Sequence, residues 1–180
     1  MTTSCLPRIL FSVLLLFYFN LEVNCTIEEF ALRFTEEGTT VREEIDVDVE
    51  GKTEVIRVPA HNNKAPMDVM NDFSSGLTAR RLPSSKECYV SQLDPTLPTP
   101  QKLKLDMELA TKQPLSDEKT IKETAISVLG FADRLALPQK ILDFCGSLPI
   151  YEVEEVSVEA MNATLNSKQG KGKKANIFRI

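Results

Sequence analysis

The chain of 180 residues contains no tryptophan, and aromatic residues make up only 7% of it. Aromatic side chains supply the large buried surfaces on which tight binding hot spots depend, so this chain lacks the usual anchors of such sites. The core must therefore rest mainly on aliphatic side chains and phenylalanine. With 42% hydrophobic residues, a chain of this length suits one modest domain with tails rather than two independent cores.

Residues that build catalytic centres and metal sites are scarce. The only histidine, His61, lies in a stretch rich in asparagine and proline, which indicates a solvated loop. No Ser-His-acid or Cys-His arrangement is supported, Cys and His ligands for a metal are lacking, and the seven glycines are scattered. Acidic pairs such as Glu43-Glu44 and Glu154-Glu155 are more typical of solvated strand faces than of general acids. We therefore expect no enzyme, no catalytic residue, no metal and no cofactor.

Positive charge is in short supply over most of the chain. The formal net charge is -5 and the isoelectric point is near 5.1, so most of the surface repels phosphate backbones and nucleic-acid binding is disfavoured. The exception is the tail, residues 168–180, which has five basic residues and no acidic one. The acidic remainder and this basic tail attract each other, and membrane contact is expected only for the tail.

Long apolar runs are also missing. The run from Ile9 to Phe19 has 11 residues, and a helix of that length covers roughly half of a hydrocarbon core. Arg8 precedes it and polar residues follow, so a signal peptide over residues 1–25 fits better than a membrane span. We expect a secreted protein whose mature chain begins at Thr26.

Only four cysteines are present, and removal of the signal peptide takes Cys5 and Cys25 with it. Cys88 and Cys145 then remain in an oxidising compartment, where we expect them to form one disulfide; two free buried thiols are the alternative. Asn162 begins the sequon Asn-Ala-Thr and is a candidate N-glycosylation site in the same compartment.

Alternating apolar and polar residues favour β-strands in much of the chain. Residues 28–58 alternate and are rich in β-branched side chains, and the turn at Gly51 predicts a β-hairpin over Val41 to Val58. A further strand is predicted from Cys88 to Leu93. Residues 120–129 fit helical spacing but also favour extension, and we interpret them as a strand.

Two short helices are predicted among these strands. The first begins at Pro100, after the capping residue Thr99, and runs to about Lys112. The second runs from Pro138 to Cys145 and ends because glycine follows. After it the chain becomes extended again, and its last six residues, 175–180, show an alternating pattern that favours pairing as a strand.

Three short motifs occur in a consistent order and spacing. They are Asn71-Asp72-Phe73 with Gly76-Leu77-Thr78-Ala79, then Cys88-Tyr89-Val90, and then Cys145-Gly146-Ser147-Leu148-Pro149-Ile150-Tyr151. Together they resemble the BRICHOS domain, over about Val55 to Val153. The resemblance implies an α+β fold with a central, mostly antiparallel β-sheet, two short helices packed on its faces, and a disulfide between Cys88 and Cys145.

The resemblance also assigns a role to Asp72. It matches the recurrent aspartate of the family, which lies near the bridge and tunes the conformation of the domain through its protonation. A turn-capping aspartate before Phe73 is the alternative interpretation. The chain differs from some relatives because it has a cleavable signal in place of a type II membrane anchor. Its C-terminal segment also lacks the paired cysteines of the polychaete antimicrobial hairpins.

These observations predict a signal peptide (1–25), an N-terminal β-hairpin region (26–58), a BRICHOS domain (55–153) and a C-terminal segment (154–180) with a disordered basic tail. A sheet of this kind can pair with an extended β-prone peptide and keep it from aggregating.

We therefore expect a secreted intramolecular chaperone or propeptide. Its partner is an extended β-prone segment, either its own cationic C-terminal segment or another client, and Lys173 and Lys174 are a candidate processing site. The alternative is a mature secreted protein in which the domain itself acts in extracellular interaction or signalling.

Overall fold

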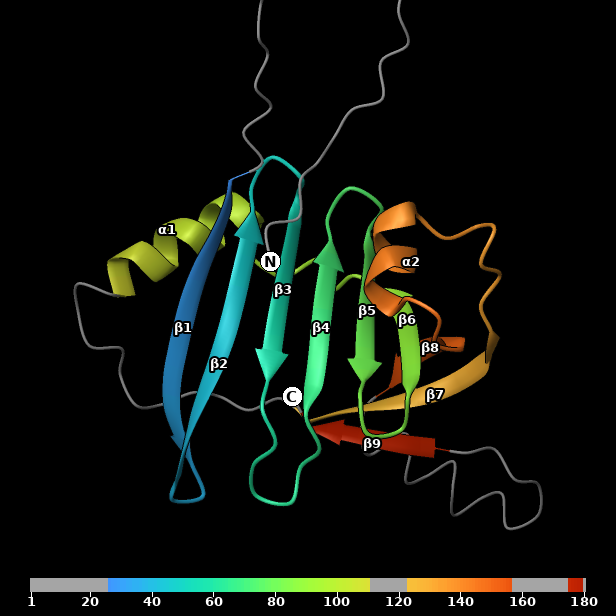
Figure 1. Ribbon diagram of the computed structural model, residues 1–180, viewed down its shortest axis with the longest axis horizontal. Coiled ribbons are helices and arrows are strands. Elements are labelled where there is room, and N and C mark those ends of the chain that lie inside the picture. The colour runs from blue at the N-terminus through green and yellow to red at the C-terminus, as the bar shows by residue number, and fades with distance from the viewer. Residues whose placement is uncertain (1–25, 111–122, 157–174, 180) are drawn as a thin grey trace, which may run out of the picture.

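One sheet dominates the computed structural model, which describes residues 26–110, 123–156 and 175–179. Its nine strands lie in the order β1-β2-β3-β4-β5-β6-β8-β7-β9 (Figure 1). The elements are β1 (Ile27–Glu36), β2 (Thr39–Asp48), β3 (Thr53–Val58), β4 (Met67–Asp72), β5 (Leu77–Leu82), β6 (Glu87–Gln92), α1 (Pro100–Ala110), β7 (Glu123–Phe131), α2 (Gln139–Cys145), β8 (Ile150–Val156) and β9 (Ala175–Arg179). Every neighbouring pair is antiparallel except β6 and β8, so the predicted fold class is confirmed.

Strands β1 to β6 form an antiparallel meander with short connections. Strands β2 and β3 pair through Glu44–Asp48 and Thr53–Arg57, where the sequence predicts a hairpin. In the turn between them, Gly51 N donates to Asp48 Oδ1 at 2.6 Å. A Cβ atom on Gly51 would lie 2.2 Å from the Asp48 carboxylate, so a side chain at this position would displace that carboxylate from its hydrogen bond.

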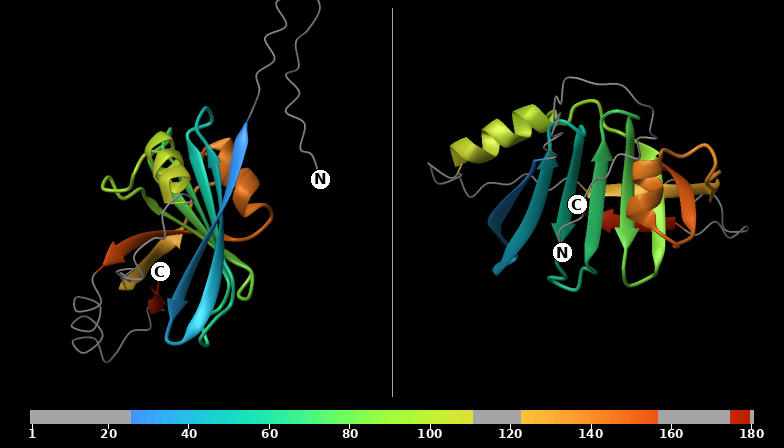
Figure 2. Two further views of the ribbon diagram at one scale, coloured as in Figure 1. Left: turned by 90° about the vertical axis from the view of Figure 1, so that its left-hand side faces the viewer. Right: turned by 45° about the horizontal axis from the view of Figure 1, so that its top comes forward.

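The two helices cover opposite faces of the sheet (Figure 2). On one face, Met107 of α1 packs against Ile45 and Val47 of β2. On the other face, Ile141 of α2 packs against the core that includes Ala79 of β5. Since successive side chains of a strand point to opposite faces, the sheet buries apolar residues on both sides.

The helix ends follow the predicted signals. Thr99 Oγ1 accepts a hydrogen bond from Lys102 N at 3.4 Å at the start of α1. The described part of α1 ends at Ala110, and the predicted end near Lys112 lies outside the described residues. Helix α2 ends where Gly146, with a φ of 61°, donates its N–H to Leu142 O at 2.8 Å.

Strands β7, β8 and β9 turn away from the direction of the meander and lie on the side that carries α1 (Figures 1 and 2). Ile126 of β7 and Val153 of β8 are buried with Val69 and Tyr89 of the meander. Strand β7 confirms the extended interpretation of residues 123–129, while residues 120–122 lie outside the described part. The register of β7 on β8 shifts between Val128 and Gly130.

A disulfide joins Cys88 of β6 to Cys145 at the end of α2, as predicted, with 5.7 Å between the two Cα atoms. Both cysteines are fully buried, and they pack with Ile141 and Ile150 in the core beneath α2. Because Cys88 also pairs with Ile150 of β8, the bridge sits where three elements meet.

We predict that replacing Cys88 and Cys145 together by alanine lowers the free energy of unfolding by roughly 4 kcal/mol, because the bridge closes a long loop in the unfolded chain. The measurement is urea unfolding of residues 26–180. A reductant should lower the stability of the native protein by a similar amount and leave the variant unchanged. Equal stability of the native and variant proteins without reductant would contradict the prediction.

Candidate functional site

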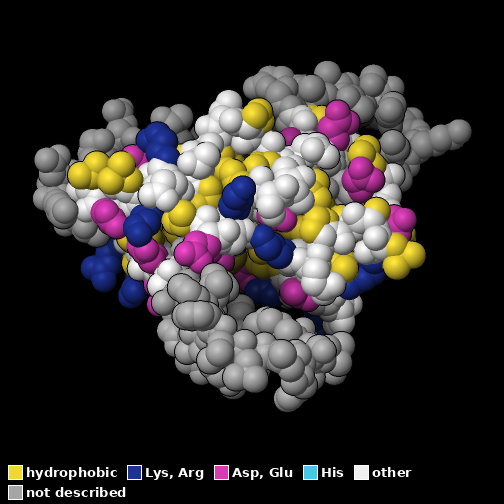
Figure 3. Space-filling model, turned by 90° about the horizontal axis from the view of Figure 1, so that it is seen from above, with side chains coloured by type: hydrophobic (Ala, Val, Ile, Leu, Met, Phe, Trp, Pro, Cys, Tyr) yellow, Lys and Arg dark blue, Asp and Glu magenta, His cyan; other side chains and the backbone are white. Residues whose placement is uncertain are grey.

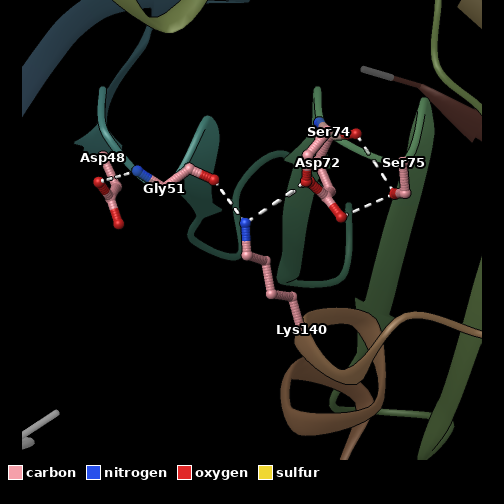
Figure 4. Close-up of polar contacts among 6 residues, drawn as sticks. All are labelled: Asp48, Gly51, Asp72, Ser74, Ser75 and Lys140. Carbon is pink, nitrogen blue, oxygen red and sulfur yellow. Dashed lines mark hydrogen bonds and ion pairs between the residues drawn. The ribbon is translucent and has the colours of Figure 1, made fainter. Parts of the chain in front are cut away.

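Asp72 lies at the end of β4 and is 1% exposed. Ser74 donates to Asp72 Oδ1 through its N–H at 3.0 Å and through its hydroxyl, and the Ser75 hydroxyl donates to Oδ2 at 2.7 Å (Figure 4). From α2, Lys140 Nζ lies 3.9 Å from Oδ1 and donates to the carbonyl of Gly51 at 2.5 Å. Asp72 and Lys140 therefore connect two turns of the meander to the helix that carries one half of the disulfide.

The surroundings of Asp72 favour its ionised form. Burial raises the pKa of this carboxyl, but the hydrogen bonds from Ser74 and Ser75 and the charge of Lys140 lower it, and the resulting pKa lies below the ordinary value of 3.8. The contact with Ser74 N also has the geometry of a turn-capping aspartate. In this fold the carboxyl therefore gains a proton only at strongly acidic pH.

A row of buried polar side chains crosses the face of the sheet that carries α1. Glu54 of β3, Asn71 of β4 and Thr78 of β5 lie side by side in the strand register. Thr78 Oγ1 donates to Asn71 Oδ1 at 2.9 Å, and Asn71 Nδ2 lies at 3.5 Å from Glu54 Oε2. Glu54 Oε1 has no hydrogen-bond partner among the residues that the structure describes.

Glu54 is therefore an unusual carboxyl. It is 2% exposed, and burial raises its pKa to about 7, although the hydrogen bond from Asn71 acts in the opposite direction. At neutral pH a large part of the folded population carries Glu54 protonated, which removes the cost of a buried charge. Local sequence patterns gave no sign of this residue.

A second polar group ties β8 to the meander. Arg80 of β5, 6% exposed, donates to Ser91 Oγ at 2.8 Å and forms an ion pair with Glu155 of β8. The expectation that Glu43 lies on a solvated strand face was wrong, whereas Glu155 is exposed as expected. Glu43 is 8% exposed because it shares a face of β2 with buried Ile45, and Glu155 pairs with a buried guanidinium.

The interpretation of His61 as a solvated loop residue was also wrong. Its side chain is 8% exposed, with Nε2 at 2.7 Å from Glu36 Oε2 and Nδ1 at 2.8 Å from Pro59 O. Lys64 Nζ donates to the other carboxylate oxygen of Glu36 at 2.6 Å, and Asn62 Nδ2 donates to the Glu36 carbonyl at 2.7 Å. This cluster joins the connection between β3 and β4 to the end of β1. The partner lies 25 residues away, so loop composition gave no sign of it.

The C-terminal strand β9 occupies the outer edge of β7. Five residues pair antiparallel, from Glu123 with Arg179 to Ser127 with Ala175. The sequence pattern of residues 175–180 predicts that this segment pairs as a strand. In the structure, Ala175–Arg179 forms the strand that extends the sheet. A segment preceded by a basic stretch therefore lies at the edge of an acidic domain.

A groove of about 700 Å³ opens beside the outer end of β8. Five of its lining residues are acidic and none is basic. Its apolar lining includes Val90 of β6 and Leu129 of β7. Figure 3 shows acidic and hydrophobic side chains next to each other on the right-hand half of the molecule, which carries these strands.

Several predicted sites lie outside the described residues. These are the signal peptide (1–25), the candidate glycosylation site Asn162 and the candidate processing pair Lys173 and Lys174. Within residues 26–110, 123–156 and 175–179, no group of three or more His, Cys, Asp or Glu residues is placed to hold a metal ion. A search of the same residues for a helix long and apolar enough to cross a membrane finds none.

Comparison with protein families identifies the family to which this domain belongs. The family model of the BRICHOS domain matches residues 63–152, which is half of the chain. The chain belongs to the BRICHOS family. No curated protein and no solved structure matches it. The BRICHOS family is generally chaperone-like, occurs in secreted or membrane proteins, and is not known as an enzyme family.

The residues that match the BRICHOS family model, 63–152, do not contain the whole sheet. Strands β1, β2 and β3 precede residue 63, and β9 follows residue 152. Helix α1 lies within the matched part but packs on β2, which does not. The core that supports the domain is therefore shared between the matched part and the strands before it.

We predict that Glu54→Gln stabilises the protein at neutral and alkaline pH. The pKa of Glu54 in the folded state, about 7, exceeds its ordinary value of 4.5, so the stability that this proton contributes is full below pH 4.5 and is lost as pH rises through 7. Glutamine stays neutral at every pH. The free energy of unfolding of the variant minus that of the native protein should therefore be up to about 3 kcal/mol larger at pH 8 than at pH 4. Urea unfolding across this pH range measures the gain.

The matched control is Glu50→Gln, which removes the same charge from an exposed turn. Its free energy of unfolding should follow the same pH dependence as that of the native protein. If the stability of Glu54→Gln also runs parallel to the native curve, the pKa of Glu54 is not raised in the folded protein.

We predict the opposite pH dependence for Asp72→Asn. The lowered pKa of Asp72 means that its contribution is present above pH 3.8 and is lost as pH falls through the folded-state pKa. Asparagine cannot accept all three hydrogen bonds, so the variant should lose about 1–3 kcal/mol at pH 7 and progressively less as pH falls below 3.8. Ser75→Ala removes one neutral donor and is the control, with a smaller loss. A loss that is constant from pH 7 to pH 2 would contradict the prediction.

Proposed function

We propose that this BRICHOS domain is an intramolecular chaperone of the secretory pathway that shields its own C-terminal segment, residues 168–180, from aggregation. The observation that carries the proposal is the pairing of β9 with the edge of β7. Without β9, strand β7 would present unpaired N–H and C=O groups at the edge of the sheet, and so would β9 itself. Pairing the two removes both hazards at once.

Backbone pairing of this kind does not require a particular client sequence. An extended segment that adds to a sheet edge gains hydrogen bonds from its main chain, and its side chains adjust only the affinity. Five residues of β9 pair in this way. The same edge can therefore accept another β-prone segment when β9 leaves it, which is the behaviour that a chaperone-like domain needs.

Charge supports the same assignment. All five basic residues of the tail lie after Ser167, and the chain as a whole is nevertheless negatively charged. An acidic domain and a basic tail attract each other over distances near a Debye length, so the tail stays concentrated near the β7 edge. In this proposal the signal peptide directs the chain to the secretory pathway, Asn162 carries a glycan, and Lys173-Lys174 is where the client segment is released as from a propeptide.

We predict that Ile177→Pro opens the β7 edge, because proline cannot donate to the ladder and disrupts the strand. In residues 26–180, the variant should lose hydrogen-exchange protection of the β9 amides and bind an added fluorescent peptide of residues 168–180. The native chain should bind that peptide at least roughly tenfold more weakly, since its own tail competes at high effective concentration.

The control is Lys171→Pro, which places proline in the same tail but before the paired strand. It should behave like the native chain in both measurements. Equal peptide binding by all three proteins, or a native β9 that exchanges as fast as a free peptide, would refute the proposed function. A native chain that is secreted and retains its tail throughout would instead favour the alternative in which the domain itself is the extracellular effector.

A further inference from the structure

The acidic groove exists because β8 leaves β6 early. The two strands pair only from Cys88 with Ile150 to Val90 with Glu152. Beyond that point they separate, and the connection after β7 closes the opening on one side, with Leu129 and Leu137 among the lining residues. The result is a groove of about 700 Å³ with an apolar lining and carboxylates around it.

The carboxylates of this groove differ in their contacts. Asp94 and Asp133 accept hydrogen bonds from backbone N–H groups of their own turns, and Glu155 pairs with Arg80. Glu152 and Glu154 are exposed, and no ion pair joins either of them to another described residue. These two side chains therefore give the groove a negative charge that the described part of the domain does not neutralise.

The direction of β9 points from its first residue back toward this groove. Strand β9 begins at Ala175, which pairs with Ser127, and Ser127 pairs on its other side with Glu154. Because β9 is antiparallel to β7, its register continued backwards from Ala175 points toward Val128 and Leu129, and Leu129 lines the groove. The two residues immediately before Ala175 are Lys173 and Lys174.

We propose that the groove binds the lysines that precede β9, and that it thereby protects the Lys173-Lys174 pair from proteases until the tail is released. A lysine side chain suits this groove because its aliphatic stem contacts apolar surface while its ammonium reaches a carboxylate at the rim. The proposal rests on the proposed function, since the pairing of β9 delivers the lysines. It adds a place where release is controlled, which backbone pairing alone does not provide.

The test uses residues 26–180 and a protease specific for basic residues, with cleavage after Lys173 or Lys174 followed by intact mass. Neutralising the groove with E152Q and E154Q together should accelerate this cleavage on the order of fivefold, the factor expected from two weak ion pairs. Added salt should accelerate cleavage of the native chain and have little further effect on the variant.

The matched control is E37Q with E50Q, which removes the same charge from exposed turns outside the groove. It should be cleaved at the native rate. Hydrogen exchange of the β9 amides is measured in all three proteins. If β9 is protected but groove variant and control are cleaved alike, the groove does not bind the lysines and the proposed function still stands. If β9 is unprotected in the native chain, the proposed function fails and this inference fails with it.

Discussion

The short parallel ladder between β6 and β8 is the constraint on which the rest of the sheet depends. Only three residue pairs join these strands, yet β7 and β9 are attached to the meander through β8. So short a ladder is weak alone. The disulfide compensates for this weakness. Cys88 pairs with Ile150 of β8 in the ladder, and Cys145, to which Cys88 is bonded, lies only five residues before Ile150. The ion pair of Arg80 with Glu155 fixes the far end of β8.

Asp72 and Glu54, on the adjacent strands β4 and β3, are buried carboxyls with shifted pKa values that lie on opposite faces of the sheet. Asp72 faces the α2 side, where hydrogen bonds and Lys140 hold its pKa below the ordinary value. Glu54 faces the α1 side, where burial raises its pKa to about 7. Mild acidification therefore changes the charge of Glu54 and leaves Asp72 ionised. Glu54, whose pKa lies near neutrality, belongs to β3 and therefore precedes the residues that match the family model.

Local patterns predicted much of this fold. Alternation identified the strands, Thr99 and Gly146 marked helix ends, and the two cysteines expected to remain in the mature chain indicated the bridge. These signals succeed because each one depends on residues close in sequence or, for the bridge, on the expectation that only two cysteines remain in an oxidising compartment.

The interpretation failed where distant strands decide exposure. His61 looked solvated from its loop composition, but its partner, Glu36, belongs to β1. Glu54 could not be identified because β3 carries Val55 and Ile56 in succession, so its alternation does not show which face is buried. The strand register determines that Glu54 stands beside Asn71, and register is a tertiary property.

The two edges of the sheet are protected in different ways, and the difference explains why only one is suited to a client. Strand β1 carries Glu28, Glu29 and Arg33, and charged side chains on an edge strand oppose pairing with another chain. Lys104 of α1 pairs with Glu28 and holds the helix against that edge. At the other edge the protection comes from β9, a segment of the chain itself that is joined to the sheet along one side only. A strand that pairs reversibly can be exchanged for another strand, whereas charges fixed on β1 cannot, so the proposed function places client exchange at the β7 edge.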